Sequence, residues 1–151
     1  MLQLARLSDR EAVEVLAKQV HALHVSWRPD LSSMPDELYP IDRFMESVSA
    51  KRLYVAKLNN QIIGYVSLKD RTYDWPGVTR RKVMLIDEFA VHEDYRNQGF
   101  GTQMMNDVKA LACAFGCSDI QLGVYPQNDA AVAFYQKCGL MIRSIEMQMK
   151  L

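Results

Sequence analysis

This chain of 151 residues has few cysteines, no excess of either charge and no long apolar run, and each lack excludes a class of protein. The three cysteines are odd in number and form no Cys-x-x-Cys spacing, which argues against a disulfide framework. Eighteen Lys and Arg residues balance eighteen Asp and Glu residues, so no net positive field attracts nucleic acid. The sequence therefore predicts reduced thiols and no nucleic-acid partner.

Apolar segments such as residues 110–117 fall far short of the roughly 18–20 residues that span a bilayer, so we expect no membrane partner. Residues 1–10 contain no apolar core of a secretory signal, which predicts a cytoplasmic location. A folded chain of this length buries roughly 70% of its unfolded surface, as one compact domain does. We expect residues 1–151 to form that single domain.

The spacing of apolar residues predicts an α/β chain of strands and helices. Its order is strand, helix, helix, three strands, helix, strand, helix and strand. The expected strands cover residues 2–7, 52–58, 62–68, 83–91, 120–124 and 140–149. The expected helices run from a capping box at 8–11 to about 25, over 41–49, over 100–115 and from 128 to about 139.

Two long loops and one short turn separate these elements. A Pro-rich loop covers residues 26–40, a second loop covers 71–80, and Asn59-Asn60 closes a hairpin. The strand–helix–strand unit from residue 83 to 124 requires a parallel pair with a right-handed crossover. We therefore expect a mixed sheet with helices on both faces.

The clearest chemical signal is the segment Arg96-Asn97-Gln98-Gly99-Phe100-Gly101-Thr102, between a buried strand and an amphipathic helix. Two glycines one residue apart let the backbone approach a ligand, and free N–H groups at a helix start attract an anion such as a phosphate. A dinucleotide fingerprint would need a third glycine at Met104, and a Walker loop would need Gly-Lys-Ser or Gly-Lys-Thr. A tight turn without a ligand is the alternative.

This segment and the strand before it resemble the central motif Arg/Gln-x-x-Gly-x-Gly/Ala of the GCN5-related N-acetyltransferase (GNAT) superfamily. The similarity is specific over residues 84–140 and concerns only the order of elements before that. Where the family places an Asn, a small residue, an aromatic–Tyr pair and Gly-Phe, this chain has Asn128, Ala131, Phe134-Tyr135 and Gly139-Leu140. The resemblance implies a GNAT fold, with a mostly antiparallel sheet and a central splayed pair of parallel strands.

The resemblance also implies acetyl-CoA as the co-substrate. In the family, pantetheine lies in the gap between the two parallel strands, and the pyrophosphate lies on the N–H groups of the glycine loop. The residues at the matching coenzyme positions are Phe89, Ala90, Val91, Arg96, Asn97, Gln98, Gly99, Gly101, Thr102, Asn128, Ala131 and Phe134.

Acetyl transfer to an amine needs a neutral nitrogen and a donor for the departing thiolate. Tyr135 aligns with the family Tyr beside the coenzyme sulfur, although from the residues alone it is equally typical of a core aromatic. Asp87 and Glu88 are equal candidates for the base, with structural ion pairs as the alternative. Strand alternation predicts that these two side chains point to opposite faces.

His24, Trp27 and Asp30 lie where the family builds its acceptor pocket, and a helix end in a mobile loop is the alternative. His21 and His24 could form half a metal site, but no third ligand is apparent, so we expect no metal. The loop over 27–46 combines acidic and aromatic residues, which favours a cationic amine.

The sequence thus predicts an acetyl-CoA-dependent N-acetyltransferase that moves the acetyl group directly to a small primary amine. Cys138, three residues after Tyr135, leaves a covalent ping-pong route open. Three alternatives remain: acetylation of protein lysines or N-termini, transfer of another acyl group, and a non-catalytic acyl-CoA binding module. The sequence also leaves open whether the chain is a monomer or a homodimer.

Overall fold

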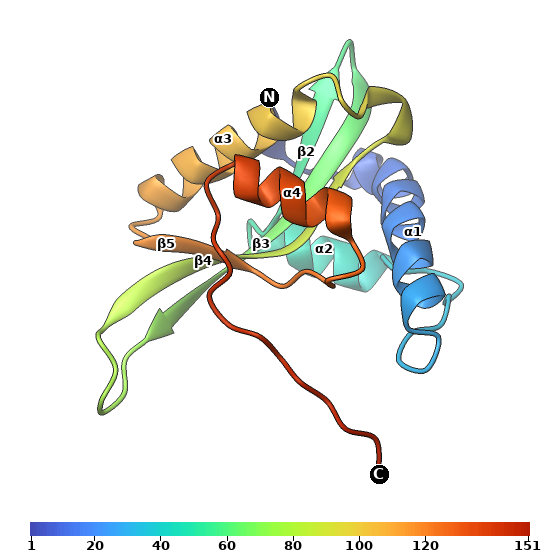
Figure 1. The fold of residues 1–151 in the computed structure, drawn as a ribbon. Coiled ribbons are helices and arrows are strands. Elements are labelled where there is room, and N and C mark those ends of the chain that lie inside the picture. Colours follow the sequence, from blue (N-terminus) through green and yellow to red (C-terminus); the bar gives the residue numbers. More distant parts are fainter.

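A five-stranded sheet in the order β1-β2-β3-β4-β5 runs through the centre of the protein (Figure 1). The structure, a computed structural model, describes residues 1–151. The strands are β1 (Leu2–Leu4), β2 (Leu53–Leu58), β3 (Gln61–Tyr73), β4 (Arg81–Val91) and β5 (Asp119–Leu122). Neighbouring strands are antiparallel except for β4 and β5, which are parallel. The predicted mixed, mostly antiparallel fold class is confirmed.

Helices cover both faces of this sheet. One face carries α1 (Arg10–Trp27) and α2 (Ile41–Ser49), and the other carries α3 (Phe100–Ala114) and α4 (Asp129–Lys137) (Figure 1). Two short 3-10 turns, η1 (Leu7–Asp9) and η2 (Glu93–Tyr95), precede α1 and α3. No helix combines the length and the apolar character needed to cross a membrane.

Strand alternation divides the buried side chains between the two faces of the sheet. Leu53 and Val55 of β2 pack with Val13 of α1, whereas Tyr54 lies between them in sequence and packs in the cluster of α3. On α3, the buried residues Met104, Met105, Val108 and Ala112 lie on one side of the helix. The sheet therefore has a filled hydrophobic layer on each face.

The hairpin between β2 and β3 confirms the turn predicted at Asn59-Asn60. Both residues have positive φ, 48° and 64°, which asparagine tolerates better than most residues. The following hairpin is longer than expected, because β3 continues to Tyr73 and β4 already begins at Arg81. The predicted capping box at 8–11 is wrong, since Asp9 instead accepts the N–H of Arg6 at 2.9 Å.

The predicted last strand over 140–149 is also wrong for the single chain. Residues 140–151 form no strand and extend away from the body after α4 (Figure 1). A strand requires a neighbouring strand for its N–H and C=O groups, and the tail has no such neighbour within its own chain. Its alternating pattern is present without the pairing that would make it a strand.

Candidate active site

The parallel strands β4 and β5, at one edge of the sheet, separate along their length. Their ladder runs from Val83 paired with Asp119 to Ile86 paired with Leu122, whereas β4 continues to Val91. Beyond this ladder, the backbone groups of residues 87–91 that face away from β3 have no strand partner. The predicted splayed parallel pair is therefore present, and it opens a gap at the C-terminal end of both strands.

A β-bulge lies where the gap begins. Ser67 of β3 pairs with Glu88, but the next residue, Leu68, pairs with Ile86, so Asp87 is the extra residue of β4. Such a bulge interrupts the alternation of side chains between the two faces of a sheet. The positions of both candidate carboxylates depend on this irregularity.

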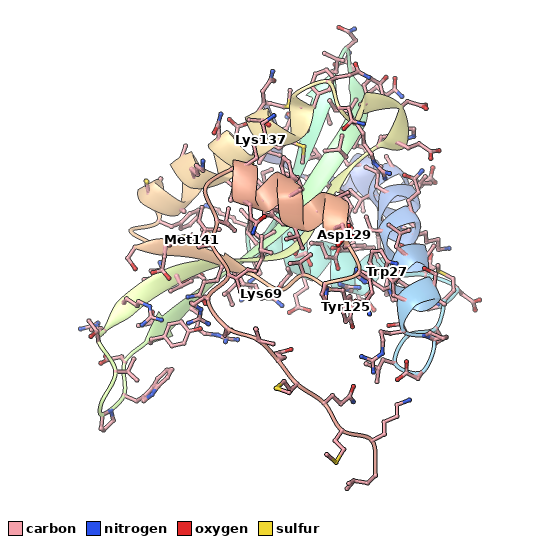
Figure 2. All side chains as sticks on the ribbon, in the orientation of Figure 1. Trp27, Lys69, Tyr125, Asp129, Lys137 and Met141 are labelled. Carbon is pink, nitrogen blue, oxygen red and sulfur yellow. The ribbon has the colours of Figure 1, made fainter.

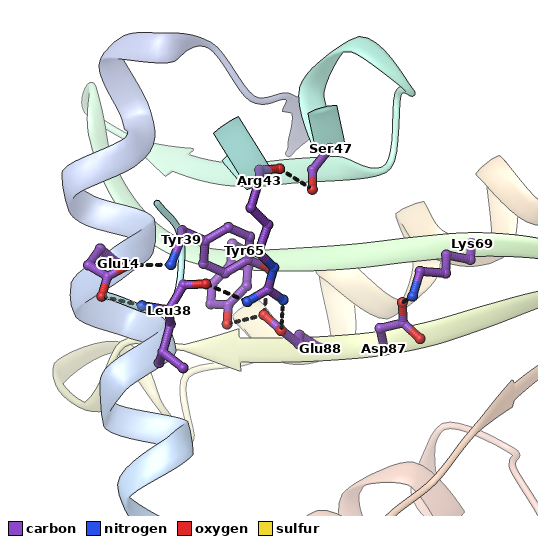
Figure 3. Close-up of polar contacts among 9 residues, drawn as sticks. All are labelled: Glu14, Leu38, Tyr39, Arg43, Ser47, Tyr65, Lys69, Asp87 and Glu88. Carbon is purple, nitrogen blue, oxygen red and sulfur yellow. Dashed lines mark hydrogen bonds and ion pairs between the residues drawn. The ribbon is translucent and has the colours of Figure 1, made fainter. Parts of the chain in front are cut away.

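Asp87 and Glu88 point to the same face of the sheet, so the prediction that they face opposite ways is wrong. Asp87 forms an ion pair with Lys69, and Glu88 accepts a hydrogen bond from Tyr65 (Figure 3). Tyr65 and Lys69 are four residues apart on β3, and residues an even number apart share a face. The bulge at Asp87 resets the alternation and turns both carboxylates towards α1 and α2.

Glu88 is held by three donors from three different elements (Figure 3). Its Oε2 accepts from the hydroxyls of Tyr39 at 2.6 Å and Tyr65 at 2.8 Å, and its Oε1 accepts from Arg43 at 3.1 Å. Burial, reinforced by the charge of Glu88, raises the pKa of both tyrosines above its usual range. Both phenols therefore remain protonated and donate to the carboxylate.

Tyr39 is itself fixed by α1. The carboxylate of Glu14 accepts the backbone N–H of Leu38 at 2.9 Å and that of Tyr39 at 2.7 Å (Figure 3). Burial would raise the pKa of Glu14, but these two hydrogen bonds and Lys18 lower it below its ordinary value. The loop before α2 is thus anchored to α1 on one side and to Glu88 on the other.

A polar pocket with no hydrophobic lining lies beside the two carboxylates. Three cations and three anions contribute to it, so its charge is balanced. The lining residues are Arg43, Glu46, Ser47, Arg52, Ser67, Lys69, Asp87 and Glu88.

An aromatic cluster connects the end of α1 with the segment that follows β5. The ring centroids of His24 and Trp27, from the end of α1, lie 5.5 and 6.4 Å from that of Tyr125, which follows β5. Figure 2 shows Trp27 and Tyr125 next to each other. Partial burial and the nearby His21 lower the pKa of His24, although Glu88 opposes this change. The sequence analysis did not identify Tyr125. The one feature that could have indicated it is its position as an aromatic residue directly after the strand that borders the gap.

Asp30 does not face this cluster as a free carboxylate. It forms ion pairs with Arg28 at 2.9 Å and with Lys150 of the tail at 2.9 Å. These contacts, Arg28 first, hold the pKa of Asp30 well below its usual range. The ring of His21 contacts the carbonyl oxygen of Ser33 at 2.8 Å.

The glycine loop presents a row of unpaired N–H groups at the start of α3. Gly99 is the N-terminal cap with a φ of 87°, and Asn97 has a φ of 60°. The N–H groups of residues 97–102 find no acceptor within the protein. Side-chain bonds from Arg96 to the Val91 carbonyl at 3.0 Å and from Gln98 to the Asp94 carbonyl at 2.7 Å fix the loop. This arrangement can bind a phosphate group.

Gly101 also lies against α4. A Cβ atom there would lie 3.2 Å from the ring of Phe134, so the glycine allows α3 to approach α4 closely. Phe134 in turn packs against Phe89 with ring centroids 5.7 Å apart. The predicted coenzyme positions on β4, α3 and α4 are therefore brought together at the gap.

The N-cap of α4 and one residue of this helix border the same region. Asn128 caps the helix, because its Oδ1 accepts the N–H of Ala131 at 3.2 Å, and no hydrogen bond uses its Nδ2. Tyr135 packs against Phe89 with ring centroids 6.2 Å apart, and burial raises the pKa of its hydroxyl to about 12. The hydroxyl of Tyr135 forms no hydrogen bond with the protein.

Comparison with known proteins identifies relatives that share this architecture. The model of the Acetyltransferase (GNAT) family matches residues 17–140. The uncharacterized N-acetyltransferase YvbK of Bacillus subtilis is 29% identical over 120 residues, which is 74% of this chain and 72% of YvbK.

Solved structures show the same similarity in three dimensions. A variant of the BH1408 protein from Bacillus halodurans superimposes with a TM-score of 0.94 and 26% identity, covering 100% of this chain and 99% of the other. Aminoglycoside N-acetyltransferase AAC(6')-Iy, solved in complex with CoA, has a TM-score of 0.72 and 16% identity with 100% of both chains covered. At that identity the likeness to AAC(6')-Iy is one of fold.

Proposed function

Because this chain belongs to the acetyltransferase (GNAT) family, we propose that it transfers an acetyl group from acetyl-CoA to a small primary amine by direct attack in a ternary complex. One observation carries the proposal: the unpaired N–H groups of residues 97–102 lie next to the gap between β4 and β5. At the same bulge, a firmly held carboxylate, Glu88, faces the side of α1 and α2. The coenzyme and the amine would thus meet at the gap.

The loop and the residues around the gap suit acetyl-CoA. The N–H groups of residues 97–102 would bind the pyrophosphate, and the unpaired edge of β4 over 87–91 would bind the pantetheine amides. The free Nδ2 of Asn128 can reach a carbonyl of the pantetheine arm. Phe89 and Phe134 would pack against the apolar part of that arm.

The amine needs help to lose its proton. At pH 7, deprotonating an alkylammonium of pKa about 10.4 costs about 4–5 kcal/mol. Both carboxylates form an ion pair, Asp87 with Lys69 and Glu88 with Arg43. We assign the base to Glu88, because its charge acts on His24 of the aromatic cluster and that of Asp87 does not. Glu88 would accept the proton directly or through a water molecule, and the rings of Trp27 and Tyr125 would pack against the cation.

The departing thiolate would be stabilised by Tyr135. The amine nitrogen forms a bond to the carbonyl carbon and loses a proton to water, the carbon–sulfur bond breaks, and the sulfur carries the electron pair. A phenol with a pKa of about 12 is a weaker acid than a thiol of pKa about 8.5, so full proton transfer to sulfur would be uphill by about 5 kcal/mol. Tyr135 would therefore act as a hydrogen-bond donor, and the proton would come from solvent.

The test combines coenzyme binding with turnover. Acetyl-CoA at 100 times its Kd should stabilise the fold by about 2.7 kcal/mol and raise the Tm. Gly99→Ala should weaken this stabilisation. A residue with a side chain disfavours a φ of 87°, so the substitution would shift the backbone of the loop. Gly77→Ala, at the tip of the β3–β4 hairpin with a φ of 84°, is the matched control and should leave the effect intact.

Turnover is measured as release of free thiol over a panel of small amines and lysine peptides. We expect release that depends on a small amine. If acetyl-CoA stabilises the protein but no amine releases thiol above the hydrolysis rate, the chain is an acyl-CoA binding module. If peptides alone release thiol, the acceptor is a protein.

A further inference from the structure

The polar pocket beside Glu88 is small and contains no hydrophobic residue. Its volume is about 160 Å³, whereas sites for drug-sized ligands measure about 300–1,000 Å³ and are lined mostly by apolar side chains. The lining comes from α2, from β3 and β4, and from Arg52 directly before β2. Such a pocket suits a short and strongly polar molecule, and it offers no apolar contact to a long alkyl chain.

Two ion pairs bring opposite charges together in this pocket (Figure 3). Lys69 pairs with Asp87, and Arg43 pairs with Glu88 at 3.1 Å. Both cations keep free donors, because an ammonium group has three N–H bonds and a guanidinium group has five. Glu88 accepts three hydrogen bonds at its two oxygens, which together offer about four acceptor positions. The pocket can therefore bind a ligand without breaking either ion pair.

Arg52 and Glu46 contribute one further charge of each sign. The backbone N–H of Arg52 donates to the carbonyl oxygen of Ser47 at 2.9 Å, and its own carbonyl oxygen accepts the N–H of Leu68 at 2.7 Å. The backbone at Arg52 is thus held between α2 and β3. Neither ion pair of the pocket involves Arg52 or Glu46, and their side chains form no hydrogen bond within the protein. The guanidinium group of Arg52 is therefore available to a ligand, and its planar fork matches a carboxylate.

The strand register places Arg52 near Glu88. Leu53, the next residue, pairs with Ser67 of β3, and Ser67 pairs with Glu88 of β4. Neighbouring strands lie about 4.8 Å apart, so the backbones at residues 53 and 88 are about 10 Å apart. Arg52 and Glu88 both line the pocket, and their side chains shorten this distance. A molecule of a few carbon atoms can therefore contact both.

We propose that the acceptor of this chain is an amino carboxylate, whose ammonium group binds at Glu88 and whose carboxylate binds Arg52 with help from Lys69. This substrate class rests on the proposed acetyl transfer and narrows it. Three cations and three anions line the pocket, so a zwitterion leaves it neutral, and a charge that leaves water is costly unless it is paired. A plain alkylamine would leave a positive excess. An aminoalkyl phosphate would leave a negative excess, because a phosphate monoester carries about −1.5 to −2 charges at pH 7.

Matched sets of acceptors test the substrate class. Each member of a series of ω-amino carboxylates is compared with the alkylamine of the same chain length and with the corresponding aminoalkyl phosphate. Thiol release from acetyl-CoA gives kcat/KM, corrected for the fraction of neutral amine. We expect the amino carboxylates to exceed the alkylamines by about 10- to 100-fold, the range expected for a hydrogen bond to a charged group.

Two results of this comparison contradict the proposal. Equal values of kcat/KM for amino carboxylates and alkylamines overturn it, while the proposed acetyl transfer stands. Aminoalkyl phosphates or lysine peptides that exceed the amino carboxylates overturn it as well, since the anion would then be a phosphate or the acceptor a protein.

Variants of two neighbouring cations locate the carboxylate site. Arg52→Gln removes the charge proposed to bind the carboxylate, whereas Lys51→Gln removes a charge that does not line the pocket. In Arg52→Gln the ratio of kcat/KM between amino carboxylate and alkylamine should fall to near one. Arg52→Lys keeps the charge without the planar fork and should retain part of this ratio, and Lys51→Gln should retain all of it. Stabilisation by acetyl-CoA shows that each variant is folded, and a ratio that survives in Arg52→Gln contradicts the proposal.

Binding without turnover separates this inference from the proposed function. If no amine releases thiol, the proposed transfer fails, and the Tm of the protein with CoA and an excess of each acceptor then tests the pocket. A rise in Tm that amino carboxylates produce, that alkylamines do not, and that Arg52→Gln abolishes supports the amino carboxylate as the ligand. If the amino carboxylates cause no such rise, the assignment of the pocket fails together with the transfer.

Discussion

The hydroxyl of Tyr39 donates a hydrogen bond to Glu88 across 2.6 Å and thereby joins the loop before α2 to the bulge of β4. Tyr65 donates to the same carboxylate oxygen from β3. Glu88 is thus fixed on the face of the sheet that carries α1 and α2, with its other oxygen bound to Arg43. The proposed base is positioned by residues distant from it in sequence.

Glu88→Gln should lower turnover at pH 7 more than Asp87→Asn does, although both replacements keep the shape of the side chain. Loss of a general base typically costs 10²- to 10⁴-fold in rate. The loss should shrink at high pH, because more of the amine is then already neutral. The pH profile of kcat/KM checks this expectation, and equal profiles for both variants would mean that solvent removes the proton.

Glu14→Gln should destabilise the protein by about 1 kcal/mol at neutral pH, since an amide accepts two backbone N–H groups less well than a carboxylate. The folded-state pKa of Glu14 lies below its ordinary value of 4.5, so its contribution is present above that pH and is lost as the pH falls through the folded value.

Thermal unfolding from pH 7 down to acid pH measures this contribution. The Tm difference between the wild type and Glu14→Gln should close below about pH 4.5, where the unfolded chain takes up the proton. A Tm difference that stays constant through this range would mean that the carboxylate charge is not involved.

The sequence predicts the part of the site that local signals encode. The glycines at 99 and 101 and the cap at Asn128 are local features, and all three lie at the gap. The bulge at Asp87 has no such signal, because it arises from the register between two strands. For the same reason, the shared face of Asp87 and Glu88 could not be predicted from strand alternation.

Contacts between elements far apart in the sequence could not be predicted either. Tyr39 and Tyr65 are ordinary aromatic residues in sequence, and only the packing of the α1–α2 loop on the sheet brings them to Glu88. The tail shows the opposite case. Its alternation over 140–149 indicates a strand, but a strand forms only where an edge is available for pairing.

Tyr125→Ala should raise the KM for the amine and leave stabilisation by acetyl-CoA unchanged. The ring centroid of Tyr125 lies 5.5 Å from that of His24 and 6.4 Å from that of Trp27, so its removal leaves the aromatic cluster incomplete. A cation–π contact at a partly exposed site is worth about 0.5–1 kcal/mol, which corresponds to a rise in KM of about two- to fivefold. Tyr125→Phe keeps the ring and should behave like the wild type, whereas an unchanged KM in Tyr125→Ala would place the amine elsewhere.

Tyr135→Phe should reduce turnover while coenzyme binding and folding change little. The ring remains, so its packing against Phe89 is preserved, and the hydroxyl has no protein partner to lose. Removing a single donor that acts on charge developing in the transition state costs about 10²- to 10³-fold, or about 2.7–4 kcal/mol of barrier.

The raised pKa of Tyr135 adds a second expectation. A hydroxyl with a pKa of about 12 stays protonated throughout the range in which the protein is assayed, so its donor is present at every pH. The ratio of wild-type to Tyr135→Phe turnover should therefore be constant from pH 7 to about pH 10, in contrast to the ratio for Glu88→Gln. If that ratio falls instead as the pH rises, the hydroxyl is ionising within this range and is not a permanent donor. Full activity in Tyr135→Phe would show that the residue only packs, and a parallel loss of acetyl-CoA binding would place its hydroxyl against the pantetheine arm.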